Sequence, residues 1–546
     1  WKRLNIFFVN IFKYYLLFSP LSDPSSFEGE GRGCFPPYVM IKSSACYHQL
    51  TSYQRHRMPP HYLDWGGQPT VYKDYPGIDP IILPPNVRPM EEKLSSLLKE
   101  REKDQPSKGI DVENLSLILR LTCSLTSKAR HAGGDFYYRS VASAGALYPT
   151  EIYVATHALN DLDDGLYHFA VRRHGLFPLR VHDLSRCIVE ISQLPERKAP
   201  VLTFFLTAIF FRSAWKYRER SYRYDLLDTG HLVENLTLAL KAFNLPFRLS
   251  YDFDDRRINH LLGLDALKEV ALAMVQVVGE EPVFVDGEQE IEEMTEDIKG
   301  ASRVSGNEID YPAIGEIHGA GMSMIIKEEA GPEMIHELGV APETWMKNED
   351  PSPWPEVLSY PNALFHRRSR RNFVKESLRK DFLMALLDCL CIKGFLSSNR
   401  EEVYGRTVCT GFLLGDAEGL SPGFYLLDTV RKSTGLVQPG LFMERMARIS
   451  LDQAWLAHTA LHFLFFTNLD FLDRVWGPRG YRYAMMAAGR MGERLYITAT
   501  TLGLGCCGIG AFYDGEAAEL LGLNKESRLL YLVAVGTVKA LKAKGF

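Results

Sequence analysis

An internal repeat divides this chain into two related halves. When the sequence is shifted by 259 positions, residues 222–264 align without a gap to residues 481–523, and thirteen of the forty-three aligned positions are identical. Average residue usage would give roughly three identities by chance. Two such similar stretches in one chain indicate a tandem duplication, in which both halves share one fold.

The first half alternates strand and helix patterns, which predicts an α+β unit. Its strand patterns are rich in β-branched and aromatic residues, and its helix patterns repeat apolar residues every three or four positions. Asp111 is of the residue type that caps a helix and directly precedes one of these patterns. The predicted elements are strands at 151–159 and 201–210, a hairpin at 164–179, and helices at 112–123 and 226–240.

Changes in composition divide the chain into four segments. Residues 1–39 begin with an apolar run, interrupted by polar residues, that is too short to span a bilayer. We expect this segment to be a disordered leader or to lie outside the native protein, which would then start near Met40. The predicted domains are 40–282 and 361–546, joined by an acidic, Pro-rich connector over 283–360.

The net charge of −5 argues against a nucleic-acid partner, and no segment predicts a membrane anchor. The nine cysteines are scattered without the spacing of a metal site, which favours a reducing, cytoplasmic setting. His48, His56 and His61 also lack the spacing of metal ligands. We therefore expect no metal site.

Residues 137–154 contain a run of small residues, Ala142 to Ala146, between an arginine and a strand pattern. Gly145 removes the steric barrier to a close approach of backbone and ligand, Ser143 offers a hydroxyl, and Pro149 limits where the strand begins. Such a loop suits a flat ligand. The alternative is a tight turn before a strand with no ligand.

Four arginines and a serine lie together at residues 367–371, ahead of a helical pattern that starts near Lys380. Guanidinium groups match phosphate oxygens in pairs, and we expect the helix N-terminus to add its dipole. A solvated basic patch or a nucleic-acid contact is the alternative. The lack of interleaved aromatic residues and of an overall basic charge favours one small phosphate.

The spacing Gly503-x-Gly505-x-x-Gly508 matches the dinucleotide fingerprint, but it follows a helix pattern and precedes a strand pattern. A Rossmann site requires the reverse order. These glycines predict a helix stop and a loop whose backbone can contact a planar ligand.

Four segments together resemble the FMN-dependent nitroreductase superfamily, in its SagB/ThcOx-type dehydrogenase branch, which includes the azoline oxidases of modified-peptide biosynthesis. The resemblance covers nearly all of residues 46–546 and implies a mixed, mostly antiparallel sheet wrapped by helices, duplicated as an intramolecular pseudo-dimer. The segments are SAGALYPTEIYV at 143–154, KYRERSYRY at 216–224, RRSRRNF at 367–373 and LGLGCCGIGAF at 502–512.

The resemblance implies FMN at the interface of the two copies. Ala142 departs from the proline that is usual in the family. The implied FMN-binding residues are Arg367, Arg368, Ser369 and Arg371 at the phosphate, Gly508, Ile509 and Gly510 beside the ring, and Ser143, Ala144, Gly145 and Leu147 from the first copy.

Each copy has kept one half of such a site. The first copy has KDQPSKG at 103–109 in place of the arginines, and Leu249 and Tyr251 where the second has Gly508 and Gly510. The second copy has no counterpart of SAGALYP. We therefore expect one composite FMN per chain and a monomer, because the tandem copies replace the usual homodimer.

Lys216 and Tyr217 match the Lys-Tyr pair of azoline oxidases. A lysine beside a phenol lowers the pKa of that phenol, so Tyr217 is a candidate general base; alternatively, Lys216 stabilises the reduced flavin. The second copy has Val475 and Trp476 at these positions. A third interpretation is a solvated, amphipathic helix start without catalytic function.

The resemblance favours an FMN-dependent oxidoreductase that takes a hydride from an azoline-like or other small or peptidic substrate. One alternative is an NAD(P)H-dependent nitro- or quinone reductase, in which NAD(P)H is a transient reductant. A second alternative is a non-catalytic flavin-binding module. The expected partner is a small-molecule or modified-peptide substrate, without nucleic acid or membrane.

Overall fold

The computed structural model describes residues 40–539 except 59–61, 86–89, 100–109, 132–133, 193–197, 278, 280–282, 284–289, 323–332, 352 and 392–402. The predicted leader, residues 1–39, and all of KDQPSKG lie outside the described residues. None of the helices in the described part is both long and apolar enough to cross a membrane.

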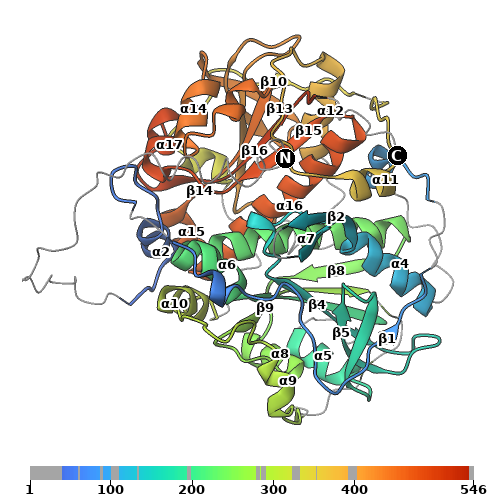
Figure 1. Ribbon diagram of the computed structural model, residues 1–546. Coiled ribbons are helices and arrows are strands. Elements are labelled where there is room, and N and C mark those ends of the chain that lie inside the picture. The colour runs from blue at the N-terminus through green and yellow to red at the C-terminus, as the bar shows by residue number, and fades with distance from the viewer. Residues whose placement is uncertain are drawn as a thin grey trace, which may run out of the picture.

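The chain forms two large sheets, one in the lower and one in the upper half of Figure 1. Each has seven strands, and the order of strands is the same in both. Every pairing within them is antiparallel, so the expected antiparallel α+β fold is confirmed, in purely antiparallel form. In spatial order the first sheet is β1 (Ile81–Ile82), β6 (Gly175–Arg180), β5 (Gly165–Ala170), β4 (Thr150–Thr156), β7 (Leu202–Ile209), β9 (Glu269–Val277) and β8 (Phe247–Ser250). The second is β10 (Met346–Lys347), β13 (Ser433–Pro439), β12 (Gly423–Asp428), β11 (Cys409–Leu414), β14 (Leu461–Asn468), β16 (Ser527–Gly536) and β15 (Gly505–Ile509).

The predicted strands and the hairpin of the first unit are confirmed as β4, β7 and the pair β5/β6. Every residue of β4, β5 and β7 is buried, which explains their nearly continuous apolar sequences. A separate hairpin, β2 (Leu125–His131) and β3 (Gly134–Arg139), leads into the small-residue loop.

Helices cover both sheets, and the two longest lie between them. The predicted helix after Asp111 is confirmed as α4, with the Asp111 carboxylate accepting from the Asn114 N–H at 2.8 Å. The helices used below are α2 (Ser44–Leu50), α4 (Val112–Thr122), α6 (Phe210–Tyr217), α7 (Ser221–Ala242), α8 (Asp255–Leu262), α10 (Pro312–Ala320), α11 (Tyr360–His366), α12 (Lys380–Leu390), α15 (Leu469–Trp476), α16 (Arg479–Thr501) and α17 (Asp514–Leu520). The others are α3 (Leu94–Leu98), α5 (Ser185–Ser192), α9 (Glu296–Gly300) and α14 (Met443–Ile449).

Helices α7 and α16 are repeat equivalents and pack against each other at the centre of the molecule (Figure 1). Gly230 of α7 and Gly489 of α16 meet at their crossing. A Cβ added at Gly230 would clash with the Met486 carbonyl, and one added at Gly489 would clash with the equivalent Leu227 carbonyl. This reciprocity indicates an approximate two-fold axis through the two glycines.

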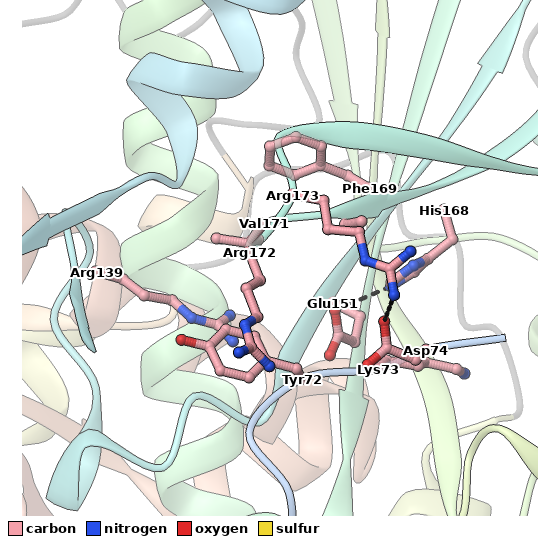
Figure 2. Close-up of a pocket in the computed structure, with 11 residues that line it drawn as sticks. Tyr72, Lys73, Asp74, Arg139, Glu151, His168, Phe169, Val171, Arg172 and Arg173 are labelled. Atoms are coloured by element: carbon pink, nitrogen blue, oxygen red, sulfur yellow. Dashed lines mark hydrogen bonds and ion pairs between the residues drawn. The ribbon is translucent and has the colours of Figure 1, made fainter. Parts of the chain in front are cut away.

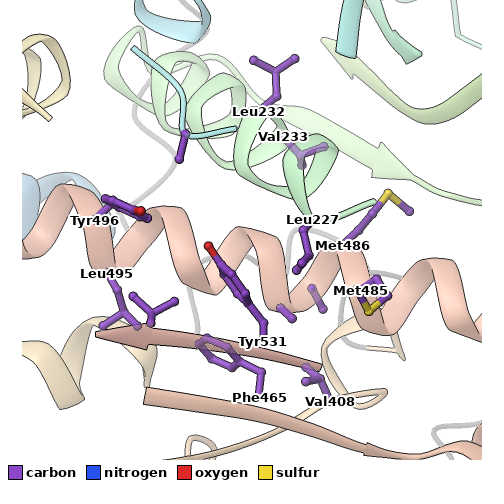
Figure 3. Packing of buried hydrophobic residues seen from close by; sticks show 14 of the residues in the cluster. Leu227, Leu232, Val233, Val408, Phe465, Met485, Met486, Leu495, Tyr496 and Tyr531 are labelled. Carbon is purple, nitrogen blue, oxygen red and sulfur yellow. The ribbon is translucent and has the colours of Figure 1, made fainter. Parts of the chain in front are cut away.

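The core is continuous across the two helices. Figure 3 shows Leu227 and Leu232 of α7 above α16, with Met485, Leu495 and Tyr496 on α16. All five side chains are at most 3% exposed. One hydrophobic core therefore joins the two units, as expected of a pseudo-dimer rather than of two loosely tethered domains.

Two equivalent ion-pair clusters also join the units. Arg220, directly before α7, and Arg223 of α7 bind Asp514 at the start of α17, with N–O distances of 2.8 and 2.6 Å. The equivalent Arg479 and Arg482 of α16 both bind Asp255 of α8 at 2.6 Å. Each unit thus anchors its long helix on the carboxylate of the other.

The predicted connector, residues 283–360, contributes to this arrangement. His318 of α10 lies 3.9 Å from Asp255, as His48 of α2 lies 3.3 Å from Asp514. His318 also contacts the Tyr222 hydroxyl at 3.2 Å, and His48 contacts the equivalent Tyr481 hydroxyl at 3.0 Å. Helix α10 therefore holds in the second unit the place that α2 holds in the first, and His48 has a structural role there.

Candidate functional site

The small-residue loop contacts the Lys-Tyr pair of its own unit. Gly145 lies in a short 3-10 turn over Ala144–Ala146, with φ of +66°. A Cβ added to Gly145 would lie 2.8 Å from the Tyr217 hydroxyl oxygen and 3.2 Å from Lys216 Nζ. The site therefore requires glycine here for its backbone conformation and for the space that the pair occupies.

Lys216 and Tyr217 form the C-terminal end of α6, so the interpretation of this segment as a helix start is wrong. Both residues are half-buried, and the Tyr217 ring lies 4.6 Å from that of Tyr224. Burial, and then the positive charge of Arg371, lower the pKa of Lys216. Arg371 belongs to the second unit, so its charge influences this lysine across the interface.

The arginine cluster lies on extended chain, so the expectation of a helix N-terminus beside it is wrong. It follows the end of α11, and α12 begins only at Lys380. Ser369 forms a bridge to Cys506 of β15, and the Arg370 N–H donates to the Cys506 carbonyl at 2.9 Å. This pairing with the sheet edge explains the extended backbone.

Extended chain sends alternate side chains to opposite sides, so Arg367, Ser369 and Arg371 share a side. Ser369 Oγ lies 2.9 Å from the Tyr496 hydroxyl, and the Arg367 guanidinium lies 5.2 Å from the Tyr496 ring centroid. Burial raises the pKa of the Cys507 thiol, and the nearby Arg371 opposes this shift. Ser369 and Arg371 are exposed, and Arg367 is buried. These three residues present cationic and hydroxyl donors along one line.

Arg367 and Arg368 are largely occupied by backbone carbonyls of the first unit. Arg367 Nε donates to the Ser140 carbonyl at 2.5 Å, and Arg368 Nη2 donates to the Thr126 carbonyl at 2.8 Å. Within the described residues, the buried Nη1 of Arg367 has no hydrogen-bond partner. Arg367 therefore retains one donor for a ligand, whereas the structure does not bring Arg368 into the group.

Gly508 of β15 and Gly510 directly after it complete the group. The Gly508 N–H donates to the Tyr496 hydroxyl at 2.6 Å, and a Cβ there would clash with the Tyr531 hydroxyl. A Cβ at Gly510 would lie 2.6 Å from the Tyr224 ring of the first unit. The side chains of Ile509 and Leu147 are 5% exposed and belong to hydrophobic clusters, so only their backbone can face a ligand.

Three buried residues beneath the loop were not identified from the sequence: Asp228 and His231 of α7, and Glu493 of α16. The Ser143 hydroxyl donates to the Asp228 carboxylate at 2.6 Å. His231 Nδ1 lies 2.6 Å from Glu493 Oε2, and its Nε2 lies 3.0 Å from the Tyr531 hydroxyl. The repeat held a signal for Asp228, because the aligned residue of the second copy is Ala487.

The equivalent position at the other end of the interface is filled by aromatic rings. Tyr404 lies five residues before β11, as Gly145 lies five residues before β4. Its ring centroid lies 4.5 Å from that of Tyr251, the repeat equivalent of Gly510, and 4.9 Å from that of Tyr483. All three tyrosines are at most 2% exposed. Two large rings therefore stand where the candidate site has two glycines.

Two other polar groups do not form comparable sites. Figure 2 shows a cavity lined by Glu151 and His168, whose volume of about 10 Å³ holds no more than one water molecule. In the described part of the chain, His157, Asp164 and Asp183 offer potential metal-ligand atoms within 4.8 Å of one another. Both carboxylates, however, already accept hydrogen bonds from nearby backbone N–H groups.

The sequence is similar to that of two proteins named for the processing of trifolitoxin and of microcin B17. It is 30% identical over 171 residues to the trifolitoxin-processing protein TfxB of Rhizobium leguminosarum bv. trifolii, covering 30% of this chain and 46% of that protein. It is 26% identical over 148 residues to the microcin B17-processing protein McbC of Escherichia coli, covering 26% of this chain and 54% of that protein. The chain thus spans about half of the length of these relatives.

The fold is similar to that of a solved protein from Anabaena variabilis ATCC 29413 that is described as a nitroreductase. The TM-score is 0.71 at 24% identity, and the match covers 91% of this chain and all of that one. A family model described as the nitroreductase family matches residues 105–280 and 439–537, half of the chain. The chain therefore belongs to the nitroreductase family.

Proposed function

We propose that this protein is an FMN-dependent oxidoreductase of the SagB/ThcOx type, with one composite flavin site per chain. One observation carries the proposal: the Gly145 loop lies against Lys216 and Tyr217 of its own unit, and Arg367 of the second unit donates to the Ser140 carbonyl just before this loop. The interface thus brings together the glycines, the arginine segment (residues 367–371) and the Lys-Tyr pair. Family membership supports oxidoreductase activity.

The residues of the site fit FMN. A phosphate needs cationic donors, and the exposed Arg371 and the free Nη1 of Arg367 can supply them. A planar ring can approach the backbone closely where no side chain intervenes. Both units provide such positions, at Gly145, Gly508 and Gly510. Arg368 is left out of the proposed site, because backbone carbonyls occupy its donors.

FMN, when bound, would supply the two-electron acceptor, and the chain would orient the substrate and manage its proton. Tyr217 is the proposed general base, accepting a proton from the substrate at its phenol oxygen. Lys216 Nζ lies 5.3 Å from the Tyr217 ring centroid, and its positive charge favours the phenolate form. The lowered pKa of Lys216 lets this amine exchange a proton with the phenol more readily than an ordinary lysine would.

We infer that the substrate is an azoline-like heterocycle in a modified peptide. The names of two relatives, processing proteins of trifolitoxin and microcin B17, support a peptide substrate. The Lys-Tyr pair supports dehydrogenation, because that reaction removes a proton as well as a hydride. Eight cysteines in the described part of the chain form no disulfide, which supports a cytoplasmic location.

Anaerobic stopped-flow reduction of the bound flavin tests this function. We expect an azoline-containing peptide to bleach the flavin, and Tyr217→Phe to slow bleaching by about 10²- to 10⁴-fold while the flavin stays bound. Trp476→Phe, at the equivalent position in α15, is the matched control and should leave the rate unchanged. Rapid bleaching by NAD(P)H alone would instead identify a reductase, and no bleaching by either would identify a flavin-binding module.

A further inference from the structure

We propose that Asp228 is the positioning residue of the site: its carboxylate holds the Ser143–Leu147 loop so that Gly145 stays against Lys216 and Tyr217. This inference rests on the proposed function, because it assigns the loop to the flavin site. It concerns the chain's own contacts, however, and can be tested without the flavin.

The carboxylate binds the loop at two successive residues. Its Oδ2 accepts from the Ser143 hydroxyl at 2.6 Å, and the Ala144 N–H donates to Oδ1 at 3.1 Å and to Oδ2 at 3.2 Å. The Ser143 Oγ in turn accepts from the Tyr148 N–H at 2.9 Å. Asp228 therefore restrains the loop directly at its start and, through Ser143, at its end.

These contacts change the role of Ser143. Its hydroxyl donates its single proton to Asp228 and accepts from Tyr148, and the Ala144 N–H is also occupied. We infer that Ser143 and Ala144 support the loop, and that the ligand meets the exposed backbone at Gly145. Asp228 acts through these two residues and does not contact the ligand.

Comparison of the two copies shows that the fold does not need this carboxylate. At the repeat-equivalent position α16 has Ala487, although the two helices share the same crossing at Gly230 and Gly489. A buried carboxylate is costly unless hydrogen bonds compensate it. This carboxylate is present only in the copy whose loop contacts the Lys-Tyr pair. We therefore infer that it serves the candidate site rather than the packing of the helices.

The surroundings of Asp228 make its charge sensitive to pH. The groups that act on it are Asp225 and His231 of α7, Glu493 of α16 and Tyr531 of β16. Burial raises the pKa of Asp228 to about 7, although the bonds from Ser143 and Ala144 and the nearby His231 favour the ionised form. The ionised carboxylate offers both oxygens as acceptors, so the loop should be held more firmly as pH rises through this value.

The test compares Asp228→Asn with Asp225→Asn, a substitution of another buried carboxyl one turn away on α7. Among the described residues, the Asp225 carboxyl accepts no hydrogen bond from the loop. Hydrogen–deuterium exchange of residues 137–149 is measured first in the flavin-free protein. We expect Asp228→Asn to speed exchange in this peptide about tenfold, because the amide presents donors where the Ala144 N–H needs an acceptor. Asp225→Asn should leave the exchange of this peptide unchanged.

Fluorescence titration with FMN at pH 6 to 8 is the second readout. We expect Asp228→Asn to weaken FMN binding about tenfold at pH 8 and to remove the dependence on pH, which Asp225→Asn should retain because Asp228 is still present. Unchanged exchange, or unchanged FMN affinity with the wild-type pH profile, would overturn the role of Asp228. Failure of the wild type to bind FMN would overturn the proposed function instead, while the exchange measurement would still decide the role of Asp228.

Discussion

The candidate site requires a left-handed backbone conformation at Gly145 and the absence of a side chain there. The φ of +66° at this residue and the nearby Tyr217 hydroxyl both oppose a side chain. We expect Gly145→Ala to displace the Lys-Tyr pair and to weaken FMN binding at least tenfold. Left-handed backbone should also cost about 1–2 kcal/mol of stability.

Gly522 is the matched control for this substitution. It has a φ of +65°, and a Cβ there would have its nearest contact at 3.7 Å, on Val340. Gly522→Ala should therefore lower the thermal stability to a similar extent without changing FMN affinity. Equal effects of the two substitutions on FMN affinity would show that Gly145 acts through stability alone.

Asp228 also predicts how stability changes with pH. Its folded pKa, about 7, lies above the ordinary value, so the folded state holds a proton that the unfolded state has lost. The contribution of this residue is thus most favourable below about pH 4 and falls by up to roughly 4 kcal/mol as pH rises to 7. Thermal unfolding should show Asp228→Asn gaining stability relative to wild type between pH 5 and 8; a constant difference would contradict the raised pKa.

The residues that lie together at the candidate site were predictable where few residue types suit the position. The small-residue loop and the Lys-Tyr pair could be selected from the sequence, and the structure brings them into contact at Gly145. The buried partners could not, because an aspartate within a helix pattern carries no sign of what it will face. The occupation of Arg368 by backbone carbonyls likewise depends on tertiary packing.

At the scale of elements, the backbone of the arginine segment is determined by pairing with a sheet edge and not by the helix pattern that follows it in the sequence. A helix pattern follows the arginines, but the chain first pairs with the edge strand β15, at Ser369 and Arg370. A backbone bond to a sheet edge can form only once the fold exists, so no local pattern reveals it. The confirmed elements, such as α4, β7 and α7, are those whose own periodicity and burial agree.

The two ion-pair clusters give a prediction at this scale. Although burial alone would raise the pKa of Asp514, Arg220 and Arg223 hold it well below its usual range, and Asp255 has the same relation to Arg479 and Arg482. Asp514→Ala and Asp255→Ala should each lower the free energy of unfolding by about 3–5 kcal/mol. The first leaves Arg220 and Arg223 buried without a carboxylate, and the second leaves Arg482 without one, while Arg479 keeps Asp252 at 3.3 Å. Urea unfolding measures this loss.

The two variants should differ in their effect on the site. Arg220 also donates to the Gly510 carbonyl at 2.9 Å, whereas its equivalent Arg479 donates to the Tyr251 carbonyl at 2.7 Å. Only Asp514→Ala should therefore weaken FMN binding in the folded protein. A comparable loss in Asp255→Ala would contradict the assignment of the site to one end of the interface.

At the scale of the whole molecule, the duplication explains the asymmetry. The repeat predicted two copies, and the matching sheets and the reciprocal glycine contacts bear out that architecture. Two copies would build two equivalent sites, yet one end has Gly145 and Gly510 and the other has Tyr404 and Tyr251. The position of Tyr404 opposite Tyr251 could not be predicted, because the residues before β11 have no sequence similarity to the Gly145 loop.

The number of FMN molecules that one chain binds tests most directly whether the two units form a single composite site. Titration of flavin-free protein with FMN, followed by the quenching of flavin fluorescence, gives the number of tight sites per chain. We predict one FMN per chain, held between the Gly145 loop and the extended segment Arg367–Arg371. Two FMN per chain, or none, would contradict it.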